Sequence, residues 1–206
     1  MVPSKEILRE KIKEHLNTVS KEEFYSQGEK AAALLRSSPL WPGHKTVYLF
    51  LSMKAEINTG PLLEAALKDG KKVYAPCIGA DVKSAGLKRK DALVFYPVLS
   101  PQGPWKKGPF GIREPLAGIN GTEGGETGEF PILVITPGLA FDREGNRLGR
   151  GRAYYDRFFA ELDAAGRSYT AIGFCMDFQL LEKVPAREYD KKMNGLAAGN
   201  ELIILS

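Results

Sequence analysis

The chain has 206 residues, 43% of them hydrophobic and 26% charged, a composition typical of a globular protein rather than a disordered segment. Its formal net charge of +4 is too small by itself to indicate nucleic-acid binding, and Cys77 and Cys175 are too few for a disulfide framework. Neither a signal-type segment nor an apolar run of membrane-spanning length occurs. We therefore expect a single cytoplasmic domain over residues 1–206, with no membrane partner.

Two helices are predicted at the N-terminus. Apolar residues recur every four positions after Ser4, with charges on the other faces, which predicts a helix with one buried face. The positions on that face are Leu8, Ile12 and Leu16. Ser20 is followed three residues later by a glutamate, as in a capping box, and predicts the start of a second helix. Its expected core residues are Phe24, Ala31, Leu34 and Leu35.

Beyond residue 45, short apolar runs rich in β-forming residues alternate with helical patterns. Strands are predicted at 46–51, 71–77, 92–98, 130–136, 169–174 and 201–205. Helices are predicted at 59–70, with Thr59 as N-cap and Gly70 as stop, and at 153–165, closed by Gly166. Nearly continuous apolar strands separated by helices predict an α/β fold. We expect a Rossmann-like three-layer sandwich, with a mainly parallel sheet and helices on both faces.

Residues 99–129 are mostly glycine, proline and polar residues. Within them, residues 119–129 (INGTEGGETGE) predict a mobile surface loop rather than a linker between domains.

The stretch RLGRGRAYYDRFF (147–159) concentrates positive charge ahead of a predicted helix. Its arginines are Arg147, Arg150, Arg152 and Arg157, against one acidic residue, Asp156. In open α/β sheets, ligands bind where loops lead from strand ends into helices. Gly149 and Gly151 allow a sharp turn that exposes N–H groups, and arginine side chains and a helix N-terminus both suit phosphate. Asp156 is placed to hold a metal that bridges those phosphates.

A second interpretation of the same stretch is a basic surface loop before an ordinary helix, with Asp156 favouring the helix dipole. The stretch matches neither a phosphate-binding loop of Walker A type nor the GxGxxG dinucleotide fingerprint. Charge and spacing alone do not separate the two interpretations.

A longer segment, PGLAFDREGNRLGRGRAYYDRFF (137–159), resembles the signature of the 5-formyltetrahydrofolate cyclo-ligases, also called methenyltetrahydrofolate synthetases. Four further elements resemble that family in the same order: KEILR (5–9), FLSMKAEINT (50–59), FGIREP (110–115) and VPAREYD (184–190). The resemblance covers essentially the whole chain, and five elements in family order are far more specific than any one alone.

The resemblance implies an enzyme that uses Mg-ATP to cyclise 5-formyltetrahydrofolate, with or without a polyglutamate tail, to 5,10-methenyltetrahydrofolate. ATP would phosphorylate the formyl oxygen, N10 would attack the activated carbon, and ADP and phosphate would be released. ATP is thus the implied co-substrate and Mg²⁺ the implied cofactor. A monomer that binds no nucleic acid is expected.

The resemblance also implies roles for individual residues. ATP would be bound by Lys5, Arg9, Arg147, Leu148, Gly149, Arg150, Gly151, Arg152, Ala153, Tyr154 and Tyr155. The folate would contact Leu51, Glu56, Arg150, Gly151, Arg152, Ala153 and Tyr154. The catalytic residues would be Arg150 and Tyr155, and the Mg²⁺ ligands Asp156 and Asp190.

Some of these roles have support from the residues themselves. Lys5 and Arg9 are four residues apart, which places both on one helical face, although without the resemblance a solvated face would explain them. Glu56 suits the paired N–H and amine of a pterin ring, or is simply an acidic residue before a helix. The adjacent Tyr154 and Tyr155 must face different directions, so one is expected to stack on a ligand and the other to join the core. Asp190 has no independent support.

Ala153 departs from the family pattern, which usually has glycine at this position, and Arg152 is a milder departure. A positive φ at Ala153 would cost about 1 kcal/mol, whereas a place in the first helical turn would be harmless. A glycine there would also allow close approach to a ligand.

Three rival functions stay open: a sugar-phosphate or acyl-transfer enzyme that works without ATP, an RNA-binding module, and a folate-binding relative without catalysis.

Overall fold

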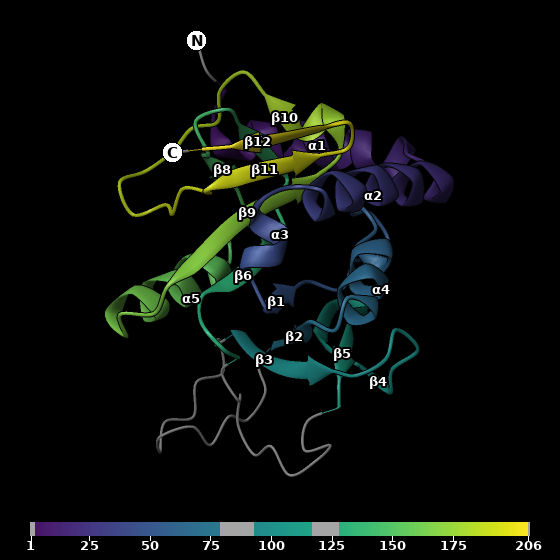
Figure 1. The fold of residues 1–206 in the computed structure, drawn as a ribbon. Coiled ribbons are helices and arrows are strands. Elements are labelled where there is room, and N and C mark those ends of the chain that lie inside the picture. The colour runs from purple at the N-terminus through teal and green to yellow at the C-terminus, as the bar shows by residue number, and fades with distance from the viewer. Residues whose placement is uncertain (1–2, 79–92, 117–127, 206) are drawn as a thin grey trace.

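The computed structural model describes residues 3–78, 93–116 and 128–205, and its centre is a seven-stranded sheet (Figure 1). Its strands, in spatial order, are β12 (Glu201–Ile204), β11 (Gly195–Ala198), β9 (Tyr169–Cys175), β6 (Ile132–Thr136), β1 (Thr46–Leu49), β2 (Lys72–Ile78) and β3 (Leu93–Val98). The strands from β11 to β2 are parallel, whereas β12 and β3 at the two edges are antiparallel to their neighbours. The mainly parallel sheet predicted from the sequence is confirmed.

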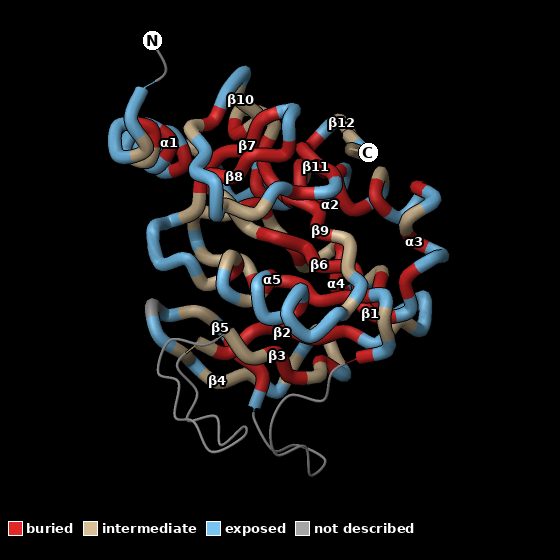
Figure 2. The backbone as a smooth tube through the Cα atoms, turned by 90° about the vertical axis from the view of Figure 1, so that its left-hand side faces the viewer, coloured by how far each residue is buried: buried red, intermediate tan, exposed pale blue. Residues whose placement is uncertain are grey.

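Helices cover both faces of this sheet, because alternate side chains of each strand point to opposite sides. Val47 and Leu49 of β1 pack in one core cluster, and Tyr48 packs in the other. The first cluster contains residues of α1 (Lys5–Thr18), α2 (Lys21–Arg36) and α4 (Gly60–Lys68). The second contains residues of α5 (Tyr154–Ala164). Figure 2 shows the buried strands behind the exposed outer side of α5. The predicted three-layer α/β sandwich is therefore confirmed.

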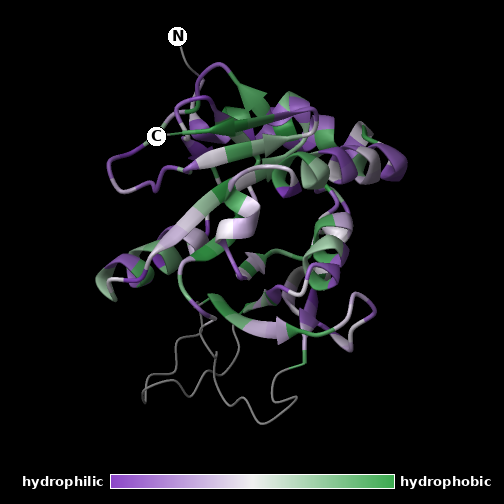
Figure 3. Ribbon diagram, in the orientation of Figure 1, coloured by the Kyte–Doolittle hydropathy of each residue, from purple (hydrophilic) through white to green (hydrophobic). Residues whose placement is uncertain are grey.

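The hydropathy of the helices agrees with this arrangement. In Figure 3, α1 and α2 are striped with hydrophobic and hydrophilic residues. On α1, Leu8, Ile12 and Leu16 are buried, as predicted. Ser4 and Ser20 cap α1 and α2, since their side chains accept the N–H groups of Ile7 and Glu23. In the part of the chain that the structure describes, no helix is both long and apolar enough to cross a membrane.

Some local details differ from the predictions. Thr59 is the N-cap residue of α4, as predicted, but its side chain makes no capping hydrogen bond, because its hydroxyl donates to the carbonyl of Phe50 at 2.7 Å. Leu34 is half-buried rather than part of the core. No element was predicted between residues 99 and 118, where the structure has a small hairpin that joins β4 (Trp105–Lys107) to β5 (Arg113–Pro115). The predicted loop at 119–129 lies outside the described residues except for its last two.

The remaining short elements were not expected. They are α3 (Leu40–Gly43), the 3₁₀ helices η1 (Pro109–Gly111) and η3 (Asp177–Gln179), and a small sheet of β7 (Ala140–Asp142), β8 (Arg147–Leu148) and β10 (Leu180–Leu181). The buried carboxylate of Asp142 organises this small sheet. It accepts the backbone N–H groups of Glu144, Asn146 and Val184 at 2.8–3.0 Å. Asp142 thereby joins the β7–β8 turn to the segment that leads to Asp190.

The topology leaves a crevice between β1 and β6. From the carboxyl end of β1 the chain passes through α4 to β2, whereas from β6 it passes through α5 to β9. Because β1 and β6 are neighbours, their loops diverge to opposite sides. Ligands bind at such switch points in open α/β sheets.

Candidate active site

A cleft of about 660 Å³ opens at this switch point, a size typical of small-molecule sites. Phe50 and Leu51 line it from the end of β1, and Pro137 and Gly138 line it from the end of β6. Of the residues that the sequence assigned to a site, all but Leu148 line this cleft. Leu148 is fully buried in the core, and its backbone pairs with the neighbouring β7 strand.

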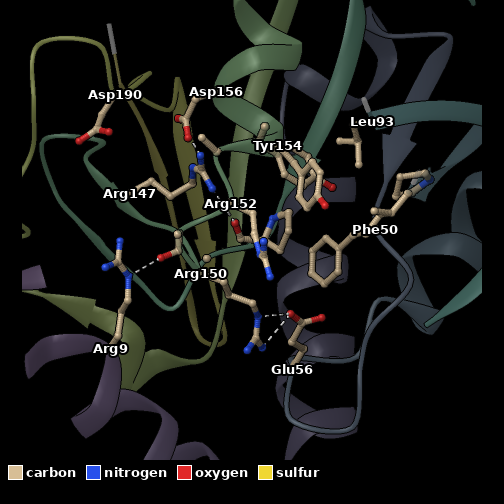
Figure 4. Close-up of a pocket in the computed structure, with 18 of the residues that line it drawn as sticks. Arg9, Phe50, Glu56, Leu93, Arg147, Arg150, Arg152, Tyr154, Asp156 and Asp190 are labelled. Carbon is tan, nitrogen blue, oxygen red and sulfur yellow. Dashed lines mark hydrogen bonds and ion pairs between the residues drawn. The ribbon is translucent and has the colours of Figure 1, made fainter. Parts of the chain in front are cut away.

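One half of the cleft is strongly cationic. Lys5 and Arg9 both line it from α1, as their spacing predicted. Lys5 Nζ lies 2.5 Å from Asp190 Oδ2, and Arg9 Nε donates to the carbonyl of Gly149 at 3.0 Å. Figure 4 shows the Arg9 side chain approaching the loop before α5 from the N-terminal helix. The structure thus brings together three of the family-like elements, which are up to 185 residues apart in the chain.

The two predicted metal ligands are each paired with a cation. Asp156 Oδ1 accepts from Arg147 Nη2 at 2.8 Å, and Asp190 binds Lys5. Burial pushes the pKa of Asp190 upward, but the hydrogen bonds from Lys5 and the Arg187 backbone and the nearby positive charges outweigh it, so the pKa lies below its usual value. Asp190 is therefore ionised at neutral pH.

Among the described residues, no three His, Cys, Asp or Glu side chains form a group able to hold a metal ion by themselves. Mg²⁺ typically takes one or two carboxylates together with phosphate oxygens, rather than a cage made only of protein. Asp156 and Asp190 fit that pattern, since both carboxylates line the cleft beside lysine and arginine side chains that suit phosphate oxygens. The donor set suits a metal that arrives with a nucleotide.

Glu56 and Arg150 meet across the cleft (Figure 4). Arg150 donates to Glu56 Oε1, and the other carboxylate oxygen accepts the N–H of Met53 at 3.0 Å. Burial raises the pKa of Glu56 above its usual value, and the positive charge of Arg150 limits that rise. A partly buried carboxylate in this position can accept two hydrogen bonds from a flat ligand that presents neighbouring N–H groups.

Tyr155 has a buried hydroxyl, and no described residue forms a hydrogen bond with it. Arg147 Nε, which lies nearby, is also buried and unpartnered within the described residues. The Arg147 guanidinium lies 5.8 Å from the centre of the Tyr155 ring. Burial, with a smaller contribution from Glu56, raises the pKa of Tyr155, which keeps the phenol neutral. Buried polar groups normally have partners, so these two donors mark a place where a ligand is expected.

Tyr154 and Tyr155 diverge, as predicted. Tyr155 joins the core beside Phe159, whereas Tyr154 is half-buried and lines the cleft near Phe50 and Leu93 (Figure 4). This half of the cleft is mostly apolar and suits a flat ring.

Ala153 has φ 52° and ψ 27°, so the strained alternative raised by the sequence applies. Gly151, two residues earlier, also has a positive φ of 99°. A left-handed residue immediately before α5 turns the arginine-rich loop into the helix. The methyl group of Ala153 makes this turn less favourable than a glycine would.

Several residues that line the cleft were not assigned to a site from the sequence. Arg187 and Tyr189 line the cleft beside Asp190, and Phe50 lines it beside Leu51. Arg187 and Tyr189 could have been found from their place within VPAREYD, close to the predicted metal ligand Asp190.

Comparisons with known proteins show the family of this chain. A family model for the 5-formyltetrahydrofolate cyclo-ligase family matches residues 1–198. A 5-formyltetrahydrofolate cyclo-ligase of Saccharomyces cerevisiae is 26% identical over 213 residues, which cover 96% of each chain. One of Escherichia coli K12 is 30% identical over 183 residues, which cover 87% of this chain and 91% of that protein.

Among solved structures, the NMR structure of Aquifex aeolicus 5,10-methenyltetrahydrofolate synthetase has a TM-score of 0.73 and 29% identity. The match covers 98% of this chain and 92% of that one. Fold, sequence and family model agree over nearly the entire length. The chain belongs to the 5-formyltetrahydrofolate cyclo-ligase family, a family of ligases.

Proposed function

We propose that this protein is an ATP-dependent 5-formyltetrahydrofolate cyclo-ligase that forms 5,10-methenyltetrahydrofolate, ADP and phosphate. The observation that carries the proposal is the division of one cleft into two halves. One half gathers cations and two carboxylates, and the other combines an apolar wall with Glu56. A reaction between a nucleoside triphosphate and a flat ring that carries an amine needs a cationic half and an apolar half next to each other.

The cationic half is suited to the triphosphate. Lys5, Arg9 and Arg147 offer charged donors, and the loop at 149–151 offers backbone N–H groups ahead of the N-terminus of α5. Asp156 and Asp190 would hold Mg²⁺, which when bound neutralises charge on the phosphate oxygens. Lys5 and Arg147 now neutralise these two carboxylates, so both cations are expected to turn toward phosphate when a nucleotide binds.

The other half is suited to the folate. Glu56 would accept the ring N–H and exocyclic amine of the pterin, and Leu51 and Tyr154 would cover its flat surfaces. Placed this way, the formyl group on N5 lies next to the arginine loop. Positioning the two reactants supplies most of the catalysis in phosphoryl transfer, because little covalent chemistry falls to the protein.

The chemistry divides between two steps. The formyl oxygen attacks the γ-phosphorus, and the bond from that phosphorus to the bridging oxygen of ADP breaks. N10 then attacks the activated carbon and loses its proton, and the carbon–oxygen bond breaks to release phosphate. Arg150 would stabilise the negative charge of the phosphoryl group, and the neutral hydroxyl of Tyr155 would donate to an oxygen of the same group.

A spectrophotometric assay tests the proposal directly. Purified protein is mixed with 5-formyltetrahydrofolate, with and without Mg-ATP, and the methenyl chromophore is followed. Product that forms only with Mg-ATP is expected. Product without ATP would favour a nucleotide-independent enzyme, and folate binding without product under any condition would indicate a non-catalytic relative.

A further inference from the structure

The rim of the cleft carries an aromatic side chain that the proposed roles leave unused. Tyr189 lines the cleft, yet its exposed fraction is 69%, unusually high for so large an apolar ring. We propose that the Tyr189 ring stacks on the adenine base of ATP. The nucleotide would then lie along α1, with its γ-phosphate toward Arg150 and its base beyond Lys5. The inference rests on the proposed function and deepens it by assigning a site to the base.

Tyr189 is held in place by a tight turn. Its hydroxyl accepts from Arg187 Nη1 at 2.7 Å. The Arg187 backbone N–H donates to Asp190 Oδ2 at 2.7 Å, and the N–H of Asp190 donates back to the carbonyl of Arg187 at 3.0 Å. Within the described part of the chain, no other aromatic ring is recorded against the Tyr189 ring. A tethered ring with open faces is suited to stacking at little entropic cost.

The contacts across the cleft show in which order Glu56, the cationic side chains and Tyr189 follow one another along it. Glu56 contacts Arg150, whose neighbour Gly149 accepts from Arg9. One turn earlier on α1, about 6 Å along the helix axis, Lys5 contacts Asp190, the residue next to Tyr189. Figure 4 shows Glu56 and Asp190 on opposite sides of the view, with Arg147 and Arg150 between them. Tyr189 therefore lies at the end of the cationic half that is farthest from Glu56.

This order determines the direction of the nucleotide. The γ-phosphate must reach the formyl group, which lies beside Glu56 in the proposed pose. The triphosphate then passes Arg9 and Lys5, and the base emerges at the rim. Every nucleobase presents a π-face, so a tyrosine ring there binds the base without hydrogen-bonded recognition.

The experiment compares binding of Mg-ATP and of Mg-tripolyphosphate, which lacks the base, by calorimetry without folate. Replacement Tyr189→Ala is expected to weaken ATP binding about 5- to 100-fold and to leave tripolyphosphate binding unchanged. Tyr189→Phe keeps the ring and is expected to bind ATP within about twofold of the unaltered protein. Tyr25→Ala is the matched control, since Tyr25 is an exposed tyrosine on α2 that does not line the cleft.

Two results would overturn the inference: unchanged ATP binding in Tyr189→Ala, or an equal loss for tripolyphosphate. An equal loss would show that the residue acts through the turn and Asp190. The proposed function fails separately. If the unaltered protein makes no methenyl product but Tyr189→Ala still selectively weakens ATP binding, the nucleotide subsite stands and the cyclo-ligase assignment falls.

Discussion

Arg150 donates from both Nε and Nη2 to a single oxygen of Glu56, at 3.2 and 3.0 Å. The two residues are 94 positions apart, and their pairing joins the loop after β1 to the loop before α5. A pterin that forms a hydrogen bond with Glu56 Oε1 has to share this oxygen with Arg150 or displace the Arg150 side chain. Displacement would release a guanidinium toward the phosphates, so this contact connects the two halves of the cleft.

Replacement Glu56→Gln is expected to raise the KM for 5-formyltetrahydrofolate by about tenfold or more, because charge-assisted hydrogen bonds to the ring are lost. The KM for ATP should change much less. Steady-state kinetics with each substrate varied in turn checks both statements, and a larger effect on ATP would place Glu56 in the nucleotide half.

The same carboxylate predicts a pH dependence. Burial raises the pKa of Glu56 above 4.5, so it takes up a proton at a higher pH than an ordinary glutamate. As pH falls through this raised pKa, the carboxylate is neutralised and kcat/KM for the folate is expected to fall. Glu56→Gln has no group to titrate there. If its pH–rate profile keeps the same acid limb, another residue is responsible.

Replacement Ala153→Gly is expected to stabilise the protein by about 1 kcal/mol, since glycine adopts the left-handed conformation without the clash of a Cβ. Urea unfolding with an unchanged m-value measures this gain. The matched control is Ala160→Gly, the same chemical change at an exposed position inside α5, where glycine should cost about 0.5–1 kcal/mol. Equal signs for the two variants would contradict the strain at Ala153.

Replacement Asp156→Asn is expected to lower kcat about 100-fold or more and to weaken Mn²⁺ binding in the presence of ATP, because the amide is a poor metal ligand. The fold should persist, since the amide oxygen can still accept from Arg147. Asp163→Asn is the control: it lies on the same helix, pairs with Lys191 and Tyr169, and does not line the cleft. Normal metal binding in Asp156→Asn would exclude Asp156 as a ligand.

Replacement Tyr155→Phe is expected to separate activity from stability. The buried hydroxyl has no partner among the described residues, so its removal should leave the free energy of unfolding unchanged or raise it by about 1 kcal/mol. The kcat is expected to fall on the order of 100-fold, because a donor to the phosphoryl group is lost. Unfolding curves and initial rates on the same preparation decide the matter. A stability loss with normal kcat would assign Tyr155 to the core alone.

Most of the fold was predictable because the sheet is buried on both faces. Such strands are apolar at nearly every position, so β1, β6 and β9 stand out in the sequence. β11 was missed since GLAA has little β-forming character, and its strand conformation depends on pairing with β9 and β12. The edge strands β12 and β3 are antiparallel because each follows its neighbour in the sheet directly along the chain. The periodicity of apolar residues does not specify this direction. The single-domain organisation, the cytoplasmic location and the monomeric state stay predictions.

The sequence by itself determined that arginines and glycines gather at 147–152 ahead of a helix, because these residues are neighbours in the chain. Only the tertiary structure decided that Arg150 meets Glu56, that Lys5 meets Asp190, that Ala153 is left-handed and that Tyr189 stands at the rim. These features depend on the switch point between β1 and β6, which brings loops from distant parts of the chain to one edge of the sheet. Pairings of this kind arise from strand order, which no local pattern of residues specifies.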